Sequence, residues 1–310
     1  MKKLRKAVQD YGALRRALGF KLERVEAGLL DFVSFLERQG TSHITTARAL
    51  QWATQPSHVQ RFVWAQRLSF VRGFARHWSA TDPRTEVPPC GLLPYRPPRA
   101  RPYLYSHEEI RRLLEAAKSL PSRHPLRPRT YYCLLGTLVV TGLRLGEVLK
   151  LRTGDIDWSE GVLTIRGTKF GKSRLVPLHR STCKVLAAYA KRRDRWVAAR
   201  APAHFFVNQN GNRLDKGDVH RTFYALSRQV GLRAPSASHG PRLHDFRHRL
   251  ALETLIRWYR SGQDPERLLP ILSTYLGHVH VADTYWYLTA CPELMGLVVK
   301  RLEKRWEGQS

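Results

Sequence analysis

The sequence predicts a mainly α-helical protein with a small antiparallel sheet, organised as an N-terminal helical bundle followed by an α+β domain. Apolar residues recur at helical spacing between Tyr11 and Ser79, whereas prolines crowd the stretch from Asp82 to Pro102. Further along, two short segments of alternating polarity flank the stretch Gly-Thr-Lys-Phe-Gly-Lys. The prolines therefore mark a boundary between two domains.

The first predicted domain, residues 1–82, is a bundle of helices. Its helical period is clearest in Leu29, Phe32, Val33 and Leu36, which would share one face of a helix. Because proline excludes regular helix and favours extended chain, residues 83–102 are predicted to form a Pro-rich linker.

The second predicted domain, residues 103–310, mixes helices with a hairpin. Ser106 and Glu109 have the spacing of a capping box, which predicts the start of a helix. Residues 162–166 and 174–178 read as paired strands, with Lys169 and Lys172 near the tip of their hairpin. An apolar-faced segment from residue 292 onward predicts a C-terminal tail helix.

The charge of the chain predicts a polyanionic partner. The 310 residues carry 53 Lys and Arg against 25 Asp and Glu, a formal net charge of +28, which is more than solubility requires. Both the first hundred residues and the remainder are basic, as contact with a nucleic-acid duplex needs. Since neither a run of about 18 apolar residues nor a signal-type core occurs, we expect no membrane partner and a bacterial-type cytoplasmic, nucleoid-associated protein.

No metal or cofactor site is predicted. The four cysteines, Cys90, Cys133, Cys183 and Cys291, lie too far apart for a zinc site or a disulfide framework. His244 and His248 have the i, i+4 spacing of a metal pair, but no third ligand follows at a diagnostic distance.

Phosphodiester transfer without a metal needs a nucleophile, fixed cations and an acid for the leaving oxygen. Arg144 follows Gly142 in a turn that opens a helix, where its planar guanidinium could hold two phosphate oxygens. His244 and Arg247, three residues apart, would share one helical face. Taken singly, each is more often an ordinary surface or ion-paired residue, so their combination has to carry the argument.

The order and spacing of the motifs resemble the tyrosine recombinase family, also called phage integrases. In that family TGLRxxE, a hairpin lysine, HxxR, LGH and a tyrosine nine residues beyond the LGH histidine follow one another. All five occur here, over roughly residues 101–290. The resemblance implies that residues 1–82 are a DNA-binding (core-binding) domain and that residues 103–310 are the α+β catalytic domain of a tyrosine recombinase.

The resemblance also implies a role for each matching residue. Arg144 and Arg247 would clamp the scissile phosphate, and Glu147 would support the site structurally. Lys169 matches the general acid of the departing 5′ oxygen; Lys172 is its rival, although a contact to a backbone phosphate suits Lys172 better.

The remaining matches supply the proton transfers and the nucleophile. His244 would act as base or proton relay, and His278 would donate to the phosphate. Tyr287 would be the nucleophile, with Tyr285, two residues earlier, as the alternative. Arg174 and Arg242 are predicted, with Lys172, to bind DNA.

The implied activity is site-specific recombination or integration of DNA, for a mobile element, without metal, ATP or cofactor. A 3′-phosphotyrosyl link would hold the cut strand until a 5′ hydroxyl of a partner duplex attacks it. The implied partners are double-stranded DNA and further copies of the chain, in a four-protomer synapse that exchanges tail helices.

Three alternatives stay open. A type IB topoisomerase would share the chemistry but relax supercoils. A catalytically idle accessory protein would bind the same DNA without forming a covalent adduct, and an RNA-binding protein would explain the charge but not the ordered motifs.

Overall fold

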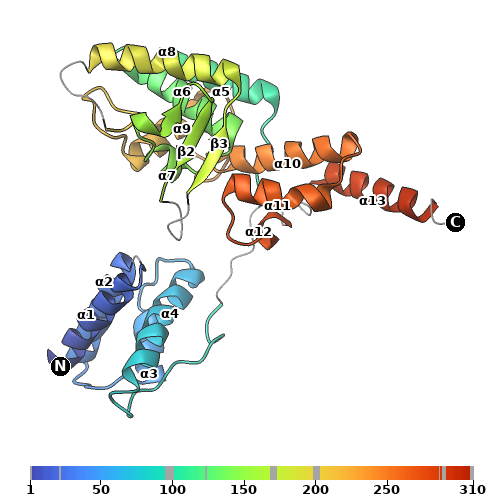
Figure 1. The fold of residues 1–310 in the computed structure, drawn as a ribbon. Helices are drawn as coiled ribbons and strands as arrows, with labels where there is room; N and C mark the ends of the chain where they lie inside the picture. The colour runs from blue at the N-terminus through green and yellow to red at the C-terminus, as the bar shows by residue number, and fades with distance from the viewer. Residues whose placement is uncertain are drawn as a thin grey trace. The chain divides into compact units, whose positions relative to one another are not determined.

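The computed structural model describes residues 2–20, 22–94, 101–122, 124–167, 173–197, 203–285, 287 and 291–307. Its internal contacts divide the chain into two compact units, Met1–Ala100 and Arg101–Ser310. Figure 1 labels the helices and strands of both units, which are described one at a time below.

The first unit is helical, as the period of its apolar residues predicts. Phe32, Trp52 and Phe74 are fully buried at its centre, and the indole N–H of Trp52 donates to Asp31 at 2.9 Å. The helices pack α1 on α2, α2 on α4 and α3 on α4. Their bounds are α1 (Lys2–Ala17), α2 (Glu23–Arg38), α3 (Thr46–Thr54) and α4 (Arg61–Trp78).

The described part of the predicted linker lies against this bundle. The amide of Glu86 donates to the carbonyl of Ile44 at 2.9 Å. The Arg72 guanidinium donates to the carbonyls of Pro88 and Pro89 at 2.7 and 2.8 Å. The stretch 83–94 is therefore held by hydrogen bonds to the rest of the first unit. Residues 95–100 lie outside the described residues.

The second unit combines helices with a three-stranded antiparallel sheet of order β1-β2-β3. This confirms the predicted fold class. Leu163 pairs with Val176 in the β2–β3 hairpin, and both side chains are buried because alternate residues face the core. The elements are α5 (His107–Lys118), α6 (Leu126–Thr141), α7 (Leu145–Val148), the 3-10 helix η1 (Thr153–Asp155), β1 (Ile156–Asp157), β2 (Val162–Ile165), β3 (Arg174–Pro177), α8 (Arg180–Trp196), α9 (Lys216–Gln229), α10 (Asp245–Arg260), α11 (Pro265–Leu276), α12 (Ala282–Tyr285) and α13 (Pro292–Glu307).

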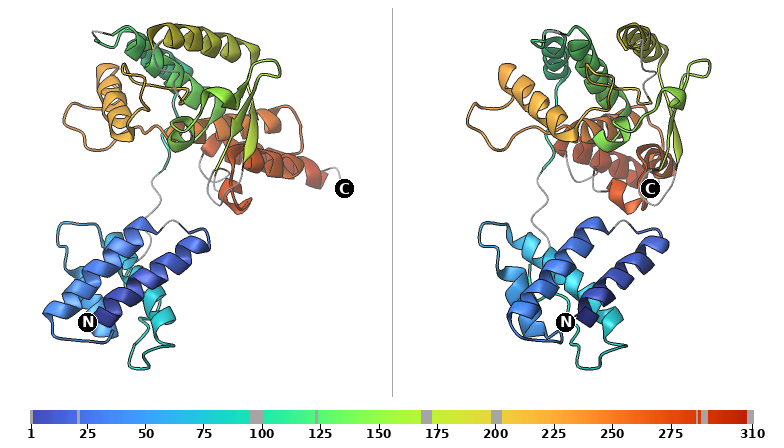
Figure 2. Two further views of the ribbon diagram at one scale, coloured as in Figure 1. Left: turned by 60° about the vertical axis from the view of Figure 1, so that its left-hand side comes forward. Right: turned by 90° about the vertical axis from the view of Figure 1, so that its left-hand side faces the viewer.

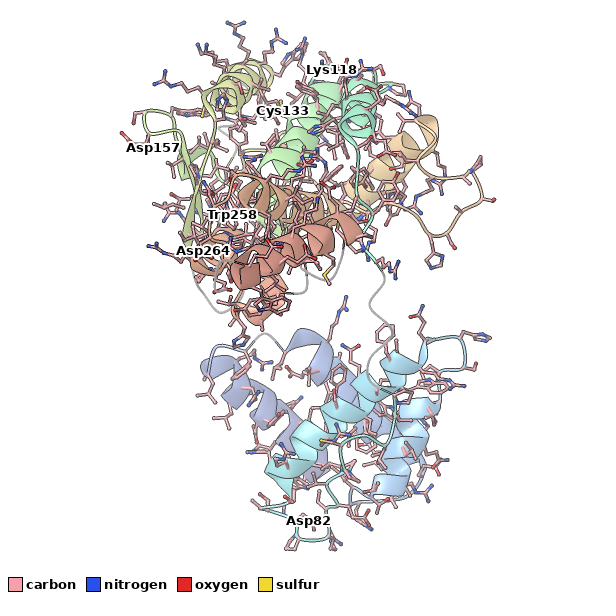
Figure 3. All side chains as sticks on the ribbon, turned by 90° about the vertical axis from the view of Figure 1, so that its right-hand side faces the viewer. Asp82, Lys118, Cys133, Asp157, Trp258 and Asp264 are labelled. Atoms are coloured by element: carbon pink, nitrogen blue, oxygen red, sulfur yellow. The ribbon has the colours of Figure 1, made fainter. Side chains whose placement is uncertain are left out.

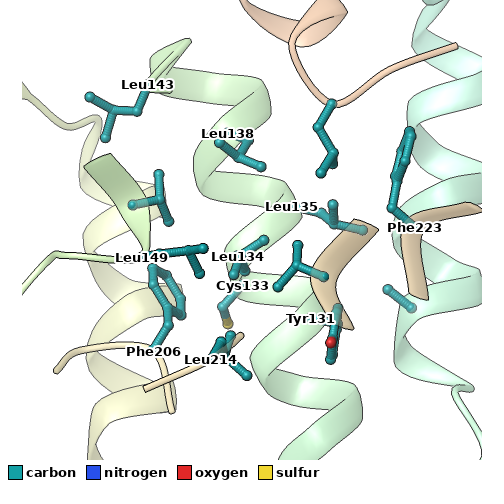
Figure 4. Close-up of a cluster of buried hydrophobic side chains, with 14 of the residues drawn as sticks. Tyr131, Cys133, Leu134, Leu135, Leu138, Leu143, Leu149, Phe206, Leu214 and Phe223 are labelled. Atoms are coloured by element: carbon teal, nitrogen blue, oxygen red, sulfur yellow. The ribbon is translucent and has the colours of Figure 1, made fainter. Parts of the chain in front are cut away.

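Helix α6 is the centre of this unit. It packs against α5, α8, α10 and α7, and its apolar residues surround the helix because neighbours cover it on several sides. Figure 4 shows Leu134, Leu135 and Leu138 of α6 among buried side chains of other segments, including Phe206 and Phe223. The end of α6 therefore has a fixed position, and the chain continues from it into Gly142 and Arg144.

Helices α10, α11 and α13 contribute to a second apolar cluster within the same unit. Figure 2 shows the ribbons of these helices in orange and red. Leu255 of α10, Leu276 of α11 and Leu294 of α13 are fully buried in it. Arg301 of α13 donates to Asp264, the N-cap of α11, at 2.9 Å; Figure 3 labels Asp264. The tail helix is thus fastened to its own chain through Leu294 in its first turn and through Arg301 further along.

Candidate active site

Arg144 is delivered by the sharp turn that ends α6. Gly142 caps the helix with φ at 60°, a left-handed conformation that favours glycine. A Cβ at position 142 would lie 2.7 Å from Cδ2 of Leu250. The glycine of the Thr-Gly-Leu-Arg motif is therefore needed both for the backbone angle and for the approach of α10.

The guanidinium of Arg144 is held on two sides. It donates through Nη1 to Oε1 of Glu147 at 2.9 Å and through Nη2 to the carbonyl of Gly277 at 3.0 Å. Because a guanidinium has five N–H groups and this side chain is 36% exposed, an incoming anion can still reach it. The geometry suits a phosphate ligand.

Glu147 is the buried carboxylate that organises the cations. It accepts from Arg174 at 3.1 and 2.8 Å and from the Arg144 side chain and amide. Burial by itself raises the pKa of Glu147, but the hydrogen bonds and charge of Arg174, with the bonds from Arg144, outweigh it and lower the pKa. The predicted supporting position of Glu147 thus has a physical basis.

Arg174 departs from its expected role in DNA binding. Its side chain is only 8% exposed, and both Nη atoms are engaged by Glu147. Nε donates to the carbonyl of Tyr275 at 2.8 Å. Arg174 therefore ties β3 to α7 and α11 from the inside, which makes it a positioning residue rather than a surface contact.

Arg247 lies in the first turn of α10 and is 1% exposed. Nη1 donates to the carbonyl of Gly142 at 2.9 Å, and Nη2 donates to the carbonyl of Leu276. Burial and the neighbouring charge of Arg144 lower the pKa of Arg247 to about 10, so the side chain keeps its charge at neutral pH. A buried cation of this kind favours an anionic ligand.

The C-terminal end of α11 joins these arginines. Its successive carbonyls at Tyr275, Leu276 and Gly277 accept from Arg174, Arg247 and Arg144 respectively. The last carbonyls of a helix have no partner within the helix and carry partial negative charge, so cations are favoured there. One helix end thus fixes three guanidinium groups beside each other.

Gly277, which ends this helix, is required by the packing. Its φ is 69°, and a Cβ at position 277 would lie 2.6 Å from Nη1 of Arg174. That guanidinium cannot move aside without losing its bonds to Glu147 and Tyr275.

Two histidines predicted for the site lie beside the arginines. Burial, with the charges of Arg247 and Arg144, lowers the pKa of both His244 and His278 to about 4. His244 is accessible to solvent, but protein atoms surround it closely enough for desolvation to be the largest cause. Both rings are therefore neutral at neutral pH, a form in which one ring nitrogen accepts and the other donates.

Tyr287 lies next to this cluster and is 2% exposed. The His278 ring stacks on it with centroids 6.1 Å apart, and the His248 ring meets it edge to face at 5.5 Å. Tyr285, the alternative nucleophile, is 51% exposed at the end of α12. Proximity to the two histidine rings favours Tyr287.

Three further residues were predicted to act in catalysis or to bind DNA. Lys169 and Lys172 lie outside the described residues, between β2 and β3. Arg242 is 47% exposed and paired with Asp245 at 2.8 Å, so its contact with DNA stays a prediction. Two neighbours of the site were missed by the sequence reasoning: His248 next to Tyr287, and Thr284, which bonds His278.

Neither a metal-binding cluster nor a membrane-spanning helix is found among the described residues. Within the described ranges no group of three or more His, Cys, Asp or Glu side chains is arranged to hold a metal ion. Over those same ranges no helix is long and apolar enough to cross a bilayer. The rings of His244 and His248, the pair with metal-like spacing, lie edge to face at 4.7 Å.

Comparison with known proteins yields one consistent result. Residues 104–293 match the model of the phage integrase family. Over the whole length of both chains, the protein is 62% identical to the integrase/recombinase y4rB of Sinorhizobium fredii.

Solved structures share the fold at low sequence identity. The integrase of transposon Tn1549 in complex with transposon right end DNA superposes with a TM-score of 0.68 at 16% identity, over 96% of this chain and 98% of that one. A lambda integrase in a tetramer on a Holliday junction gives 0.58 at 18% identity, over 89% and 77% of the respective chains.

We predict that Gly277→Ala disrupts the site more than the backbone angle alone would. Gly262 has the same φ of 69° but nothing within 4 Å of a Cβ, so Gly262→Ala measures the backbone strain by itself. That strain costs about 1–2 kcal/mol. Urea unfolding should show a larger loss for Gly277→Ala, because the Arg174 contacts are lost as well. Equal losses for the two variants would contradict the packing argument.

The ion pair of Glu147 predicts a pH dependence of stability. Since the folded-state pKa of Glu147 is lowered from the ordinary value of 4.5, its stabilisation is complete above that pH and is lost as the pH falls through the folded pKa. Removing one partner of a buried pair costs about 3–5 kcal/mol. Glu147→Gln should therefore be less stable than the native chain at pH 7 by roughly that amount.

Urea unfolding at pH 7, 5 and 3.5 measures this dependence. The difference between the native chain and Glu147→Gln should shrink at the lowest pH, whereas Glu115→Gln, which alters an exposed ion pair with Lys118, should barely differ from the native chain. A difference for Glu147→Gln that stays constant with pH would contradict the assignment.

Proposed function

This chain belongs to the phage integrase family, the tyrosine recombinases that cut and rejoin DNA at specific sites, and we propose that Tyr287 is its nucleophile. In the proposed step the Tyr287 oxygen attacks a DNA phosphate, the bond from phosphorus to the 5′ oxygen breaks, and a 3′-phosphotyrosyl link forms. Reversal by a 5′ hydroxyl of another duplex rejoins the strands. The bond energy is conserved in the link, so the reaction needs no ATP.

The observation that carries this proposal is the arginine pair on the end of α11. Arg144 and Arg247 donate to the adjacent carbonyls of Gly277 and Leu276, so their guanidinium groups are held close together before any substrate arrives. Preorganised cations stabilise the charge that develops on phosphoryl oxygens in the transition state. They supply what metal ions supply in other phosphoryl-transfer enzymes.

The proton transfers are assigned to three further side chains predicted for the site. His244, uncharged at neutral pH, is proposed to take the Tyr287 proton directly or through a relay. His278 is proposed to donate to a phosphate oxygen, and Lys169 to protonate the departing 5′ oxygen. Glu147 and Arg174 act through Arg144, because they fix its position.

The burial of Tyr287 implies a movement during the reaction. At 2% exposure within the apolar cluster of α10, α11 and α13, its ring is covered by protein. Tyr287 therefore has to become exposed before its hydroxyl meets a phosphate. Such a step would couple cleavage to the binding of DNA or of a second protomer.

We propose a mobile element as the biological setting. The fold shared with a transposon integrase and the 62% identity to a chain named as an integrase/recombinase support it. The DNA flanking the gene is then the first place to look for the recombined sites. Because its substrate is DNA, we place the enzyme at the nucleoid of a bacterial-type cytoplasm.

Mass spectrometry of protein trapped on a nicked suicide duplex, made from the flanks of the gene, tests the nucleophile. The native chain and Tyr285→Phe should form an adduct at Tyr287, while Tyr287→Phe should form none. An adduct on Tyr285 would overturn the assignment. Tight binding without any adduct would favour an accessory DNA-binding protein, and relaxation of supercoils without strand exchange would favour a topoisomerase.

We further propose that α13 assembles protomers on DNA, four on two duplexes, as the lambda integrase tetramer suggests. Leu294 faces its own core, but Met295, Val299 and Leu302 are exposed at 46%, 48% and 42%. These three residues are spaced i, i+4 and i+7, so they form one apolar stripe along the helix. A neighbouring protomer is the proposed cover for it.

The double variant Val299→Asp, Leu302→Asp should abolish DNA-dependent assembly and leave binding of a single protomer intact. The stripe is exposed, so stability should hold, whereas deletion of residues 291–310 would remove buried Leu294. Val185→Asp, at a 41% exposed position of α8, is the control for an aspartate placed on an exposed helix face. Native mass spectrometry on a two-site duplex that shows unchanged assembly would exclude this role for the stripe.

A further inference from the structure

Thr284 lies directly behind the histidine that is proposed to contact the phosphate. Its Oγ1 is 2.8 Å from Nδ1 of His278, and Thr284 is fully buried. Thr284 lies in the short helix α12, and its amide donates to the carbonyl of Val281 at 2.7 Å. The contact joins residues six positions apart in the sequence.

The direction of this hydrogen bond decides what His278 can do. Burial with the charges of Arg247 and Arg144 lowers the pKa of His278 to about 4, so the ring is neutral at neutral pH and has a single N–H. If that hydrogen were on Nδ1, Nε2 would present a lone pair and repel a phosphate oxygen. If Thr284 donates to Nδ1, the hydrogen is on Nε2 and the ring donates to the phosphate.

We infer that Thr284 is a positioning residue that holds His278 in the tautomer with hydrogen on Nε2. The inference rests on the proposed function, because it concerns the donor that His278 offers to the scissile phosphate. The threonine hydroxyl can turn to donate, and Nδ1 supplies the acceptor that a buried hydroxyl needs. This is the arrangement in which the second nitrogen of a histidine sets the role of the first.

The same residue links the donor to the nucleophile. Thr284 is three residues before Tyr287, and the His278 and Tyr287 rings lie nearly parallel, 21° apart, at 6.1 Å. The His278 ring therefore contacts both the Thr284 hydroxyl and the Tyr287 ring.

The competing interpretation is that Thr284 only fills space. Thr284→Val has nearly the same shape but lacks the hydroxyl, and Thr284→Ser keeps the hydroxyl with one methyl fewer. If Thr284 only fills space, the serine variant should form the adduct more slowly than the valine variant. If Thr284 positions His278, the valine variant should be the slower of the two.

Nitrogen NMR of the full chain with ¹⁵N-labelled histidine tests the tautomer without DNA. The signals of His278 are identified among the 13 histidines by comparison with His278→Gln. The native chain and Thr284→Ser should show hydrogen on Nε2, and Thr284→Val should show a mixture of tautomers. Hydrogen on Nδ1 in the native chain would overturn the inference.

Cleavage of the nicked suicide duplex tests the consequence. Thr284→Val should slow adduct formation about tenfold, which corresponds to one hydrogen bond, and Thr284→Ser should stay near the native rate. In a His278→Ala background, Thr284→Val should cause no further loss. A tenfold loss that persists without His278, or a native rate in Thr284→Val, would refute the positioning role.

The two proposals fail in different ways. If the native chain forms no adduct on a duplex that it binds tightly, the proposed recombination chemistry fails, whatever the NMR shows. If the native chain forms the adduct and Thr284→Val keeps both the native tautomer and the native rate, only the role of Thr284 fails.

Discussion

The end of helix α11 is the constraint on which the rest of the site depends. Three consecutive carbonyls, at Tyr275, Leu276 and Gly277, accept from three arginines that come from different parts of the chain. The last carbonyls of a helix have no partner within the helix and carry partial negative charge. They therefore favour cations, and here they hold three guanidinium groups beside each other. Two glycines lie where a side chain would collide with its neighbours. Gly142 stands in the Thr-Gly-Leu-Arg motif and Gly277 in the Leu-Gly-His motif.

The close guanidinium groups repel one another, and a bound phosphate would offset this repulsion. Burial and the proximity of Arg144 lower the pKa of Arg247, and burial together with the charges of Arg247 and Arg144 keeps His244 and His278 neutral at neutral pH. Glu147 offsets part of the repulsion from the inner side. In the proposed function, a DNA phosphate is the anion that would offset the remaining positive charge. Affinity for the phosphate and stabilisation of the transition state would then come from the same groups.

Much of this fold was predictable from the sequence, for identifiable reasons. Helical periodicity located the bundle around Leu29 and Phe32, and alternation located the hairpin, because both patterns follow directly from burial. The spacing of motifs identified the residues that gather around α11. Packing that depends on tertiary contacts was not predictable. Arg174, in a basic hairpin strand, has the sequence features of a surface cation, yet Glu147 draws it inside.

Thr284 and residues 83–94 illustrate the same limit. A threonine in a short spacer gives no sign that its hydroxyl meets a histidine six residues earlier. Prolines exclude helix between Asp82 and Pro102, but they do not prevent a segment from packing, and Arg72 fastens this one through the carbonyls of Pro88 and Pro89. In both cases the position of the segment depends on a hydrogen bond that no local sequence pattern reveals.

A crystal structure of the chain on a nicked duplex, with vanadate in place of the scissile phosphate, would test directly whether the end of α11 preorganises the two arginines. We expect Arg144 and Arg247 to bind vanadate oxygens while they keep their bonds to the carbonyls of Gly277 and Leu276. If either guanidinium leaves its carbonyl to reach the vanadate, the end of α11 does not preorganise the site.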